Sequence, residues 1–275
     1  MNNQSVIEKM KGLRKCYFGF FAIFGFYHSL LFFDNASMYA MFPIISYFLF
    51  FIIGGMFLLS AKNKKPEYYF VESVIMVFFF VVYSMLSLFL SLITIQAKSL
   101  YDIHSTFSLI IIGILILGYI VGKFLVIKND FREIPDKIKI RGSEIEIKSM
   151  NFWSELSLSK APWLEKPLKS IKYGVGYFII LVGGSASGLS LAAVEGLKRS
   201  EILGSDINPH AFLFFVFGVP VALISGIVLY PLFSYLFRWR KLTKEIKREY
   251  GSYTLLLNLD NKPYSQLKSE IENDH

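Results

Sequence analysis

The sequence is poor in the residues and motifs that usually mark an enzyme or a disulfide-stabilised domain. It has one cysteine, Cys16, which cannot form a disulfide within a single chain. It has no P-loop, GxGxxG, HExxH or CxxC pattern. These short motifs hold phosphates, dinucleotides, zinc or redox-active thiols. The sequence therefore gives no support to a nucleotide- or cofactor-dependent enzyme, and we predict no catalytic residue, cofactor site or metal site.

Charge is missing from several long hydrophobic runs. Hydrophobic residues make up 54% of the 275 residues, and the mean hydropathy is +0.48. Runs such as Val77–Val82 are apolar on every side, so they cannot present a polar face to water as a surface helix does. A bilayer requires about 20 apolar residues in a spanning helix. The sequence predicts an integral membrane protein whose first partner is the lipid bilayer.

The lack of charge in the middle of the apolar runs also bears on function. His28, Glu72 and Glu195 all fall near the ends of predicted spans. Ion-coupled transport commonly uses a carboxylate inside the membrane, and voltage sensing uses repeated arginines within a span. The sequence therefore gives no support to a voltage sensor and weakens the hypothesis of an ion-coupled transporter.

Basic residues are in excess, and they are unevenly placed. Of the 29 Lys and Arg residues, 25 lie in four segments that alternate with three loops carrying only three. These basic segments are residues 1–15, 61–67, 128–172 and 238–275. Cations resist translocation, so we expect these segments and both termini to lie in the cytoplasm. The predicted location of the protein is the cytoplasmic membrane. This bias also accounts for the net charge of +8 without nucleic acid, although anionic lipid at the inner surface stays an open partner.

The apolar runs predict a mainly α, polytopic protein with six transmembrane helices in groups of four and two. The predicted spans are residues 16–33, 38–60, 68–95, 106–127, 173–194 and 211–237. The corresponding regions are 1–127 with the first four spans, 128–172 as a cytosolic insert, 173–237 with the last two spans, and 238–275 as a basic helix and tail.

The insert contains a strict alternation of isoleucine and charge on both sides of Gly142-Ser143. Alternation with a period of two predicts strands, and Gly followed by Ser suits a type II′ hairpin turn. Across residues 137–148 the register pairs Arg141 with Glu144 and Lys139 with Glu146. The sequence therefore predicts a β-hairpin with its isoleucines on one face.

An isolated hairpin is marginal in water and needs a cover for its apolar face. We expect a third strand from residues 252–259, where leucines alternate with polar residues, and an interfacial segment from Asn151–Trp163. A cytosolic protein partner could bind the same surface. The candidate interaction patch comprises Ile138, Ile140, Ile145, Ile147, Trp153 and Trp163.

Small residues recur at helical spacing inside the spans. Such residues let helices approach closely in membranes, or they line a permeation path. Packing is the preferred interpretation, with pore lining as the alternative. The candidate residues are Gly118, Gly122, Gly184, Ser185, Ser187, Gly188, Ser84 and Ser87.

These features favour a non-enzymatic membrane effector, channel-like or scaffold protein with a cytosolic recognition patch. The alternative is a small-solute transporter that uses the Gly-, Ser- and Pro-containing last two spans. An intramembrane serine hydrolase is a remote third hypothesis: Ser185–Gly188 resembles the rhomboid protease serine motif only loosely, because Ser185 stands where that motif has glycine. The substrate and the oligomeric state are not determined by the sequence, and a homo-oligomer is open.

Overall fold

The structure is a computed structural model that describes residues 3–34, 37–63, 66–126, 137–150 and 186–272, with residues 156, 162 and 166. It is mainly helical, with one small sheet. The elements in chain order are α1 (Asn3–Phe33), α2 (Met38–Asn63), the 3₁₀ helix η1 (Pro66–Tyr69), α3 (Phe70–Thr94), α4 (Ile103–Leu125), β1 (Ile138–Arg141), β2 (Glu144–Ile147), α6 (Ala186–Arg199), α7 (Pro209–Tyr250), β3 (Thr254–Leu257) and α8 (Tyr264–Glu272).

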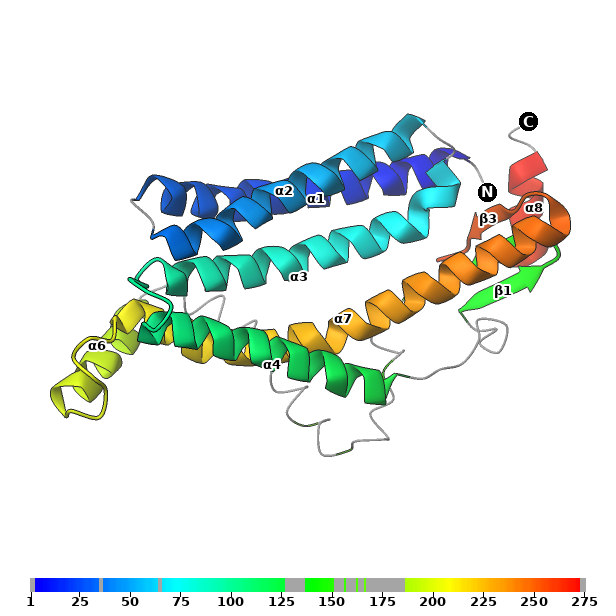
Figure 1. Ribbon diagram of the computed structural model, residues 1–275. Coiled ribbons are helices and arrows are strands. Elements are labelled where there is room, and N and C mark those ends of the chain that lie inside the picture. The colour runs from blue at the N-terminus through cyan, green and yellow to red at the C-terminus, as the bar shows by residue number, and fades with distance from the viewer. Residues whose placement is uncertain are drawn as a thin grey trace.

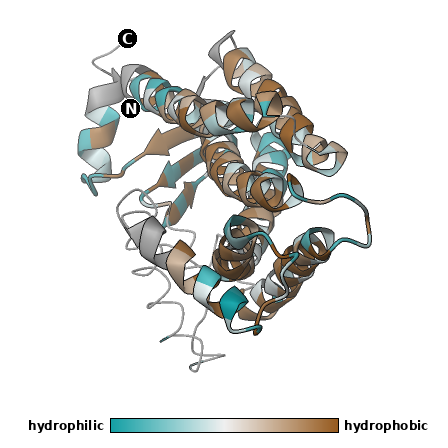
Figure 2. Ribbon diagram, turned by 90° about the vertical axis from the view of Figure 1, so that its left-hand side faces the viewer, coloured by the Kyte–Doolittle hydropathy of each residue, from teal (hydrophilic) through white to brown (hydrophobic). Residues whose placement is uncertain are grey.

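Five of the described helices are long and apolar enough to cross a membrane, namely α1, α2, α3, α4 and α7. They coincide with five of the six predicted spans, and they are compatible with a multi-pass membrane protein. The remaining predicted span is the fifth, residues 173–194. Its residues 173–185 lie outside the described residues, and α6 begins at Ala186 and ends at Arg199. A sixth span therefore stays a prediction. Figure 2 shows the long helices mostly in the colours of hydrophobic residues.

The helices run roughly side by side, with α3 between the α1–α2 layer and the α4–α7 pair (Figure 1). The sheet, α8 and both termini lie together at one end of the bundle, which we call the sheet end. The loop after α3, helix α6 and the start of α7 lie at the other end, which we call the loop end.

Helix α7 is longer than a bilayer requires. Its 42 residues span about 63 Å at 1.5 Å per residue, about twice the hydrocarbon thickness of a membrane. Pro209 occupies the first turn after the cap Asn208, whose side chain accepts hydrogen bonds from two backbone N–H groups. The helix ends only at Gly251, whose positive φ of 78° glycine adopts without strain. The basic second half of α7 therefore extends beyond the apolar segment and reaches the sheet.

Glycines set the contact between α4 and α7. A Cβ on Gly122 would lie 2.6 Å from the carbonyl oxygen of Ile227, and one on Gly118 would collide with the backbone of Leu223. From the other side, Gly226 of α7 faces the backbone of α4 at Leu115. Main-chain atoms cannot rotate away as side chains do, so these three positions admit only glycine. Gly118 and Gly122 thus lie where two helices touch.

The sheet has the predicted hairpin and the predicted third strand. β1 pairs antiparallel with β2, with Arg141 opposite Glu144 and Lys139 opposite Glu146, which confirms the register. Gly142 in the turn has a φ of +58°, the conformation for which it was predicted. β3, from the C-terminal tail, adds to β2 in parallel and completes a sheet of order β1-β2-β3.

Candidate functional site

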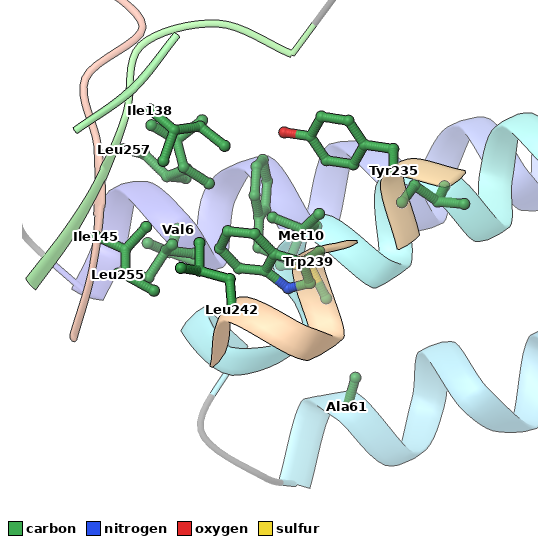
Figure 3. Packing of buried hydrophobic residues seen from close by; sticks show 14 of the residues in the cluster. Val6, Met10, Ala61, Ile138, Ile145, Tyr235, Trp239, Leu242, Leu255 and Leu257 are labelled. Carbon is green, nitrogen blue, oxygen red and sulfur yellow. The ribbon is translucent and has the colours of Figure 1, made fainter. Parts of the chain in front are cut away.

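The sheet end is held together by one hydrophobic cluster, called here the junction. It joins one face of the sheet to the start of α1, the end of α2, the start of α3 and the second half of α7. Figure 3 shows the strand side chains facing Trp239 and Leu242 of α7 and Val6 of α1. Its buried members are Val6, Met10, Ala61, Phe70, Val71, Ile75, Ile138, Ile145, Ile147, Leu232, Tyr235, Trp239, Leu242, Ile246, Leu255 and Leu257. Burial of this kind stabilises by about 1.5–3 kcal/mol per large side chain, so the cluster attaches the sheet firmly to the helices.

The isoleucines that were predicted as part of an interaction patch lie in the junction. Ile145 and Ile147 are 0% exposed, Ile138 is 2% exposed, and Ile140 is half-buried against the same cluster. The cover comes from α7 and α1, which sequence reasoning did not consider as partners of the hairpin. The alternation correctly indicated that this face is buried, but it carried no information on what buries it. Trp153 and Trp163 lie outside the described residues.

The opposite face of the sheet carries a charged network that fixes the tail. Glu146 is 2% exposed; its Oε1 accepts a hydrogen bond from Asn258 Nδ2 at 2.7 Å, and its Oε2 lies 3.4 Å from Arg141 Nη2. The Tyr264 hydroxyl donates to the Glu144 carboxylate, which raises the pKa of Tyr264 above its ordinary value. The guanidinium of Arg141 lies 3.7 Å from the centre of the Tyr264 ring. These contacts hold β3 and α8 against the hairpin.

A pocket of about 540 Å³, called here the lysine pocket, opens between η1, α7 and the start of β3. Its lining is aromatic and cationic, with Tyr68, Tyr69, Glu72, Trp239, Thr243, Lys244, Lys247, Ser252 and Tyr253. Tyr68 and Tyr253 meet edge to face at 4.6 Å, which ties the tail to η1. Glu72 is ion-paired with Arg240 Nε at 2.9 Å, so the one carboxylate in the lining is already neutralised.

A second hollow, of about 550 Å³, lies beside the hairpin on another side of α7. Lys139, Arg141 and Gly142 of the hairpin face Ile246, Glu249 and Tyr250 of α7 across it. Tyr250 is 54% exposed, so an aromatic ring stands free at the edge of this hollow. We call this the hairpin hollow.

Ser84 and Ser87, predicted for packing or a pore, lie on the face of α3 that is buried in the bundle. Ser87 Oγ lies 2.8 Å from His28 Nε2, and His28 Nδ1 lies 2.7 Å from the carbonyl oxygen of Phe24. His28 also stacks on Tyr47 with ring centres 4.0 Å apart. Since a carbonyl only accepts, Nδ1 carries the proton in neutral His28 and Nε2 accepts from Ser87. The pair links α1 to α3 as a satisfied structural contact, and sequence reasoning did not find it.

The remaining small-residue candidates are only partly within the described residues. Gly184 and Ser185 lie outside them. Ser187 and Gly188 lie in the first turn of α6. His210 is exposed at the start of α7.

At the loop end, His104 joins the caps of two helices. Asp102 caps α4 by accepting from the His104 backbone N–H at 2.9 Å, and its Oδ1 also lies 2.6 Å from His104 Nδ1. His104 Nε2 in turn accepts from the backbone N–H of Asn208, the cap of α7, at 3.2 Å. Both nitrogens of the ring are therefore engaged, and the group fixes the loop end without a free base for catalysis.

Asp102 is expected to make stability depend on acid pH. The donated His104 backbone N–H lowers the pKa of Asp102 below its ordinary value of 3.8. A lowered folded pKa stabilises the fold above the ordinary pKa, and this contribution is lost as the pH falls through the lowered value. D102N keeps a capping oxygen without charge, so we expect it to be less stable than wild type by about 1 kcal/mol at about pH 7 and equal to it near pH 2. Denaturant unfolding at both pH values checks this, and a difference that does not change with pH would contradict it.

Comparison of the chain with protein-family models, curated proteins and solved structures finds no match in any of the three. The function is therefore argued from the two ends of the molecule and from the pockets at the sheet end.

Proposed function

We propose that this protein is a non-enzymatic membrane effector or scaffold whose sheet end lies in the cytoplasm and recognises a cytosolic protein partner. The observation that carries the proposal is the junction, because it joins a three-stranded sheet to four membrane helices in one continuous core. A partner that binds and displaces the sheet would therefore also displace these helices. The recognising surface is the hairpin hollow, since the isoleucine face is buried.

Charge supports the cytoplasmic placement of the sheet end. The basic end of α7, the hairpin and the start of α1 gather there (Figure 1). The first three turns of α1 include Lys9 and Lys11, and cations favour the cytoplasmic side. The hairpin and the start of α6 lie at opposite ends of the bundle (Figure 1), which supports a further crossing between them and hence the six predicted spans.

Photo-crosslinking in cells tests the proposal. A photoreactive residue at Tyr250, in the hairpin hollow, is expected to give a discrete protein adduct, whereas the same residue at Ser205, exposed at the loop end, is not. The adduct should disappear in the I145D background, which damages the junction, while the amount of protein in the membrane is unchanged. Crosslinks from Tyr250 to lipid alone, or adducts that persist in I145D, would contradict the proposal.

The transporter alternative has a separate test. Gly118, Gly122 and Gly226 are occupied by helix contact, so they do not line a path for a solute. Proteoliposomes with the purified protein should therefore show no solute or ion flux above that of empty vesicles. A flux that bulky replacements at Gly184 and Ser187 abolish would replace the scaffold proposal with a transporter.

A further inference from the structure

We infer that the lysine pocket is a binding site for the phosphate group of an anionic phospholipid headgroup. The inference rests on the proposed orientation, which places the sheet end at the inner leaflet. The site lies on another side of α7 from the hairpin hollow, so lipid and protein partner would bind separate surfaces.

The positive charge of the pocket favours binding of an anion. Lys244 and Lys247 are three residues apart on one helix, and like charges at that spacing repel. Neither side chain makes an ion pair or a hydrogen bond with any described residue, and the Glu72 carboxylate in the same lining is taken by Arg240. The lining therefore keeps two positive charges without a counter-ion, and a phosphate group matches them in sign.

The donors in the pocket also match a phosphate. Each lysine ammonium has three N–H donors, and the exposed Ser252 hydroxyl lies in the same lining. Thr243 contributes shape only, because its hydroxyl donates back to the carbonyl oxygen of Trp239 at 3.0 Å. Three donor side chains from α7 and the chain before β3 can thus surround the phosphate oxygens.

The depth of the pocket favours a lipid as the source of the phosphate. The apolar part of α7 ends at Phe237, and Trp239 and Lys244 follow at about 3 and 10 Å along the helix axis. The headgroup layer occupies about 5–7 Å on each side of the hydrocarbon core, and long lysine side chains reach toward it. Tyr68 and Tyr69 supply the amphipathic rings that gather at this depth. A phosphate at this level belongs to a headgroup.

Lipid titration of the purified full-length protein tests the inference. In a neutral detergent, added phosphatidylglycerol is expected to raise the melting temperature in a saturable way, whereas phosphatidylcholine is not. K244Q/K247Q should weaken the apparent affinity for phosphatidylglycerol about thirtyfold, because each basic residue near an anionic lipid contributes about a factor of five. The control K241Q/R248Q removes two exposed cations of the same helix that do not line the pocket, and it should bind like wild type.

Three results would overturn the inference. Equal losses in both double variants would mean that only general charge matters. Saturation by inorganic phosphate at the same concentration as the lipid would make the ligand a soluble phosphate compound. Equal effects of the two lipids would remove the requirement for a net negative headgroup, because the phosphate of phosphatidylcholine is balanced by its choline cation. If K244Q/K247Q does not fold, S252A decides, since loss of its exposed hydroxyl should weaken phosphatidylglycerol binding about threefold to tenfold. Absence of lipid binding would not change the crosslinking result expected at Tyr250, so the proposed function is tested independently of this inference.

Discussion

Replacing Gly226 by alanine is expected to lower the free energy of unfolding by about 3 kcal/mol or more, the upper part of the range for overpacked interiors. The added Cβ would lie 2.7 Å from the backbone nitrogen of Tyr119 and against the carbonyl oxygen of Leu115. Both are main-chain atoms of α4, so relief requires the two helices to move apart. Denaturant unfolding of the purified protein in detergent measures the loss.

Gly113→Ala is the matched control for Gly226→Ala. Gly113 lies in α4 as well, but a Cβ there would have no atom within 4 Å. Because alanine restricts the unfolded chain more than glycine does, G113A is expected to be neutral or more stable by about 0.5–1 kcal/mol. Equal losses in G226A and G113A would mean that close approach of α4 and α7 is not what holds this pair together.

The second large effect is expected at the junction, where Ile145→Asp should detach the sheet from the helices at a cost of about 3–5 kcal/mol. Ile145 is fully buried, and the cluster around it consists of hydrophobic side chains, so the new carboxylate would have no cation to pair with. Hydrogen exchange measures the effect directly. The amides of residues 138–147 and 254–257 should lose protection, while those of α4 keep it as an internal reference.

Ile145→Val is the conservative control at the same site. It removes one methyl group and adds no polar atom, so we expect a loss of about 1 kcal/mol with the protection of the strands retained. If the strand amides exchange equally fast in I145D and I145V, the sheet does not depend on the junction. The proposal that a partner bound to the sheet acts on the helices is then contradicted.

The two ends of the molecule differ in what they carry, and this bears on the proposed role. The loop end combines a hydrophobic cluster that includes Ile93 and Phe107 with the hydrogen-bonded caps at Asp102, His104 and Asn208. The sheet end is fixed by a large apolar core and carries both pockets. Apolar contacts over a wide area keep the orientation of the sheet relative to α7, which is the property that a recognition element attached to a membrane bundle requires.

Local pattern in the sequence determined much of the architecture. The five long apolar helices follow from uninterrupted hydrophobic runs, because a helix in lipid satisfies its own backbone hydrogen bonds and needs only length. The hairpin and its register follow from alternation and from Gly142, since both act between residues a few positions apart. The alternation in residues 252–259 likewise predicted β3, but it did not predict that β3 runs parallel to β2.

Only the tertiary structure decided what covers each buried face. His28 meets Ser87 across 59 positions, and Glu72 meets Arg240 across 168, so no spacing rule connects them. The four-residue spacing of Gly118 and Gly122 predicted a close helix contact. Gly226 makes the same contact from α7, but it belongs to no such spaced pair, so the sequence did not indicate its role. The isoleucine pattern indicated that this face of the hairpin is buried, but it did not indicate which segment buries it, because hydrophobic burial is non-directional. The long α7 supplies that cover, and its lysines consequently come to line a pocket with residues from η1 and the tail.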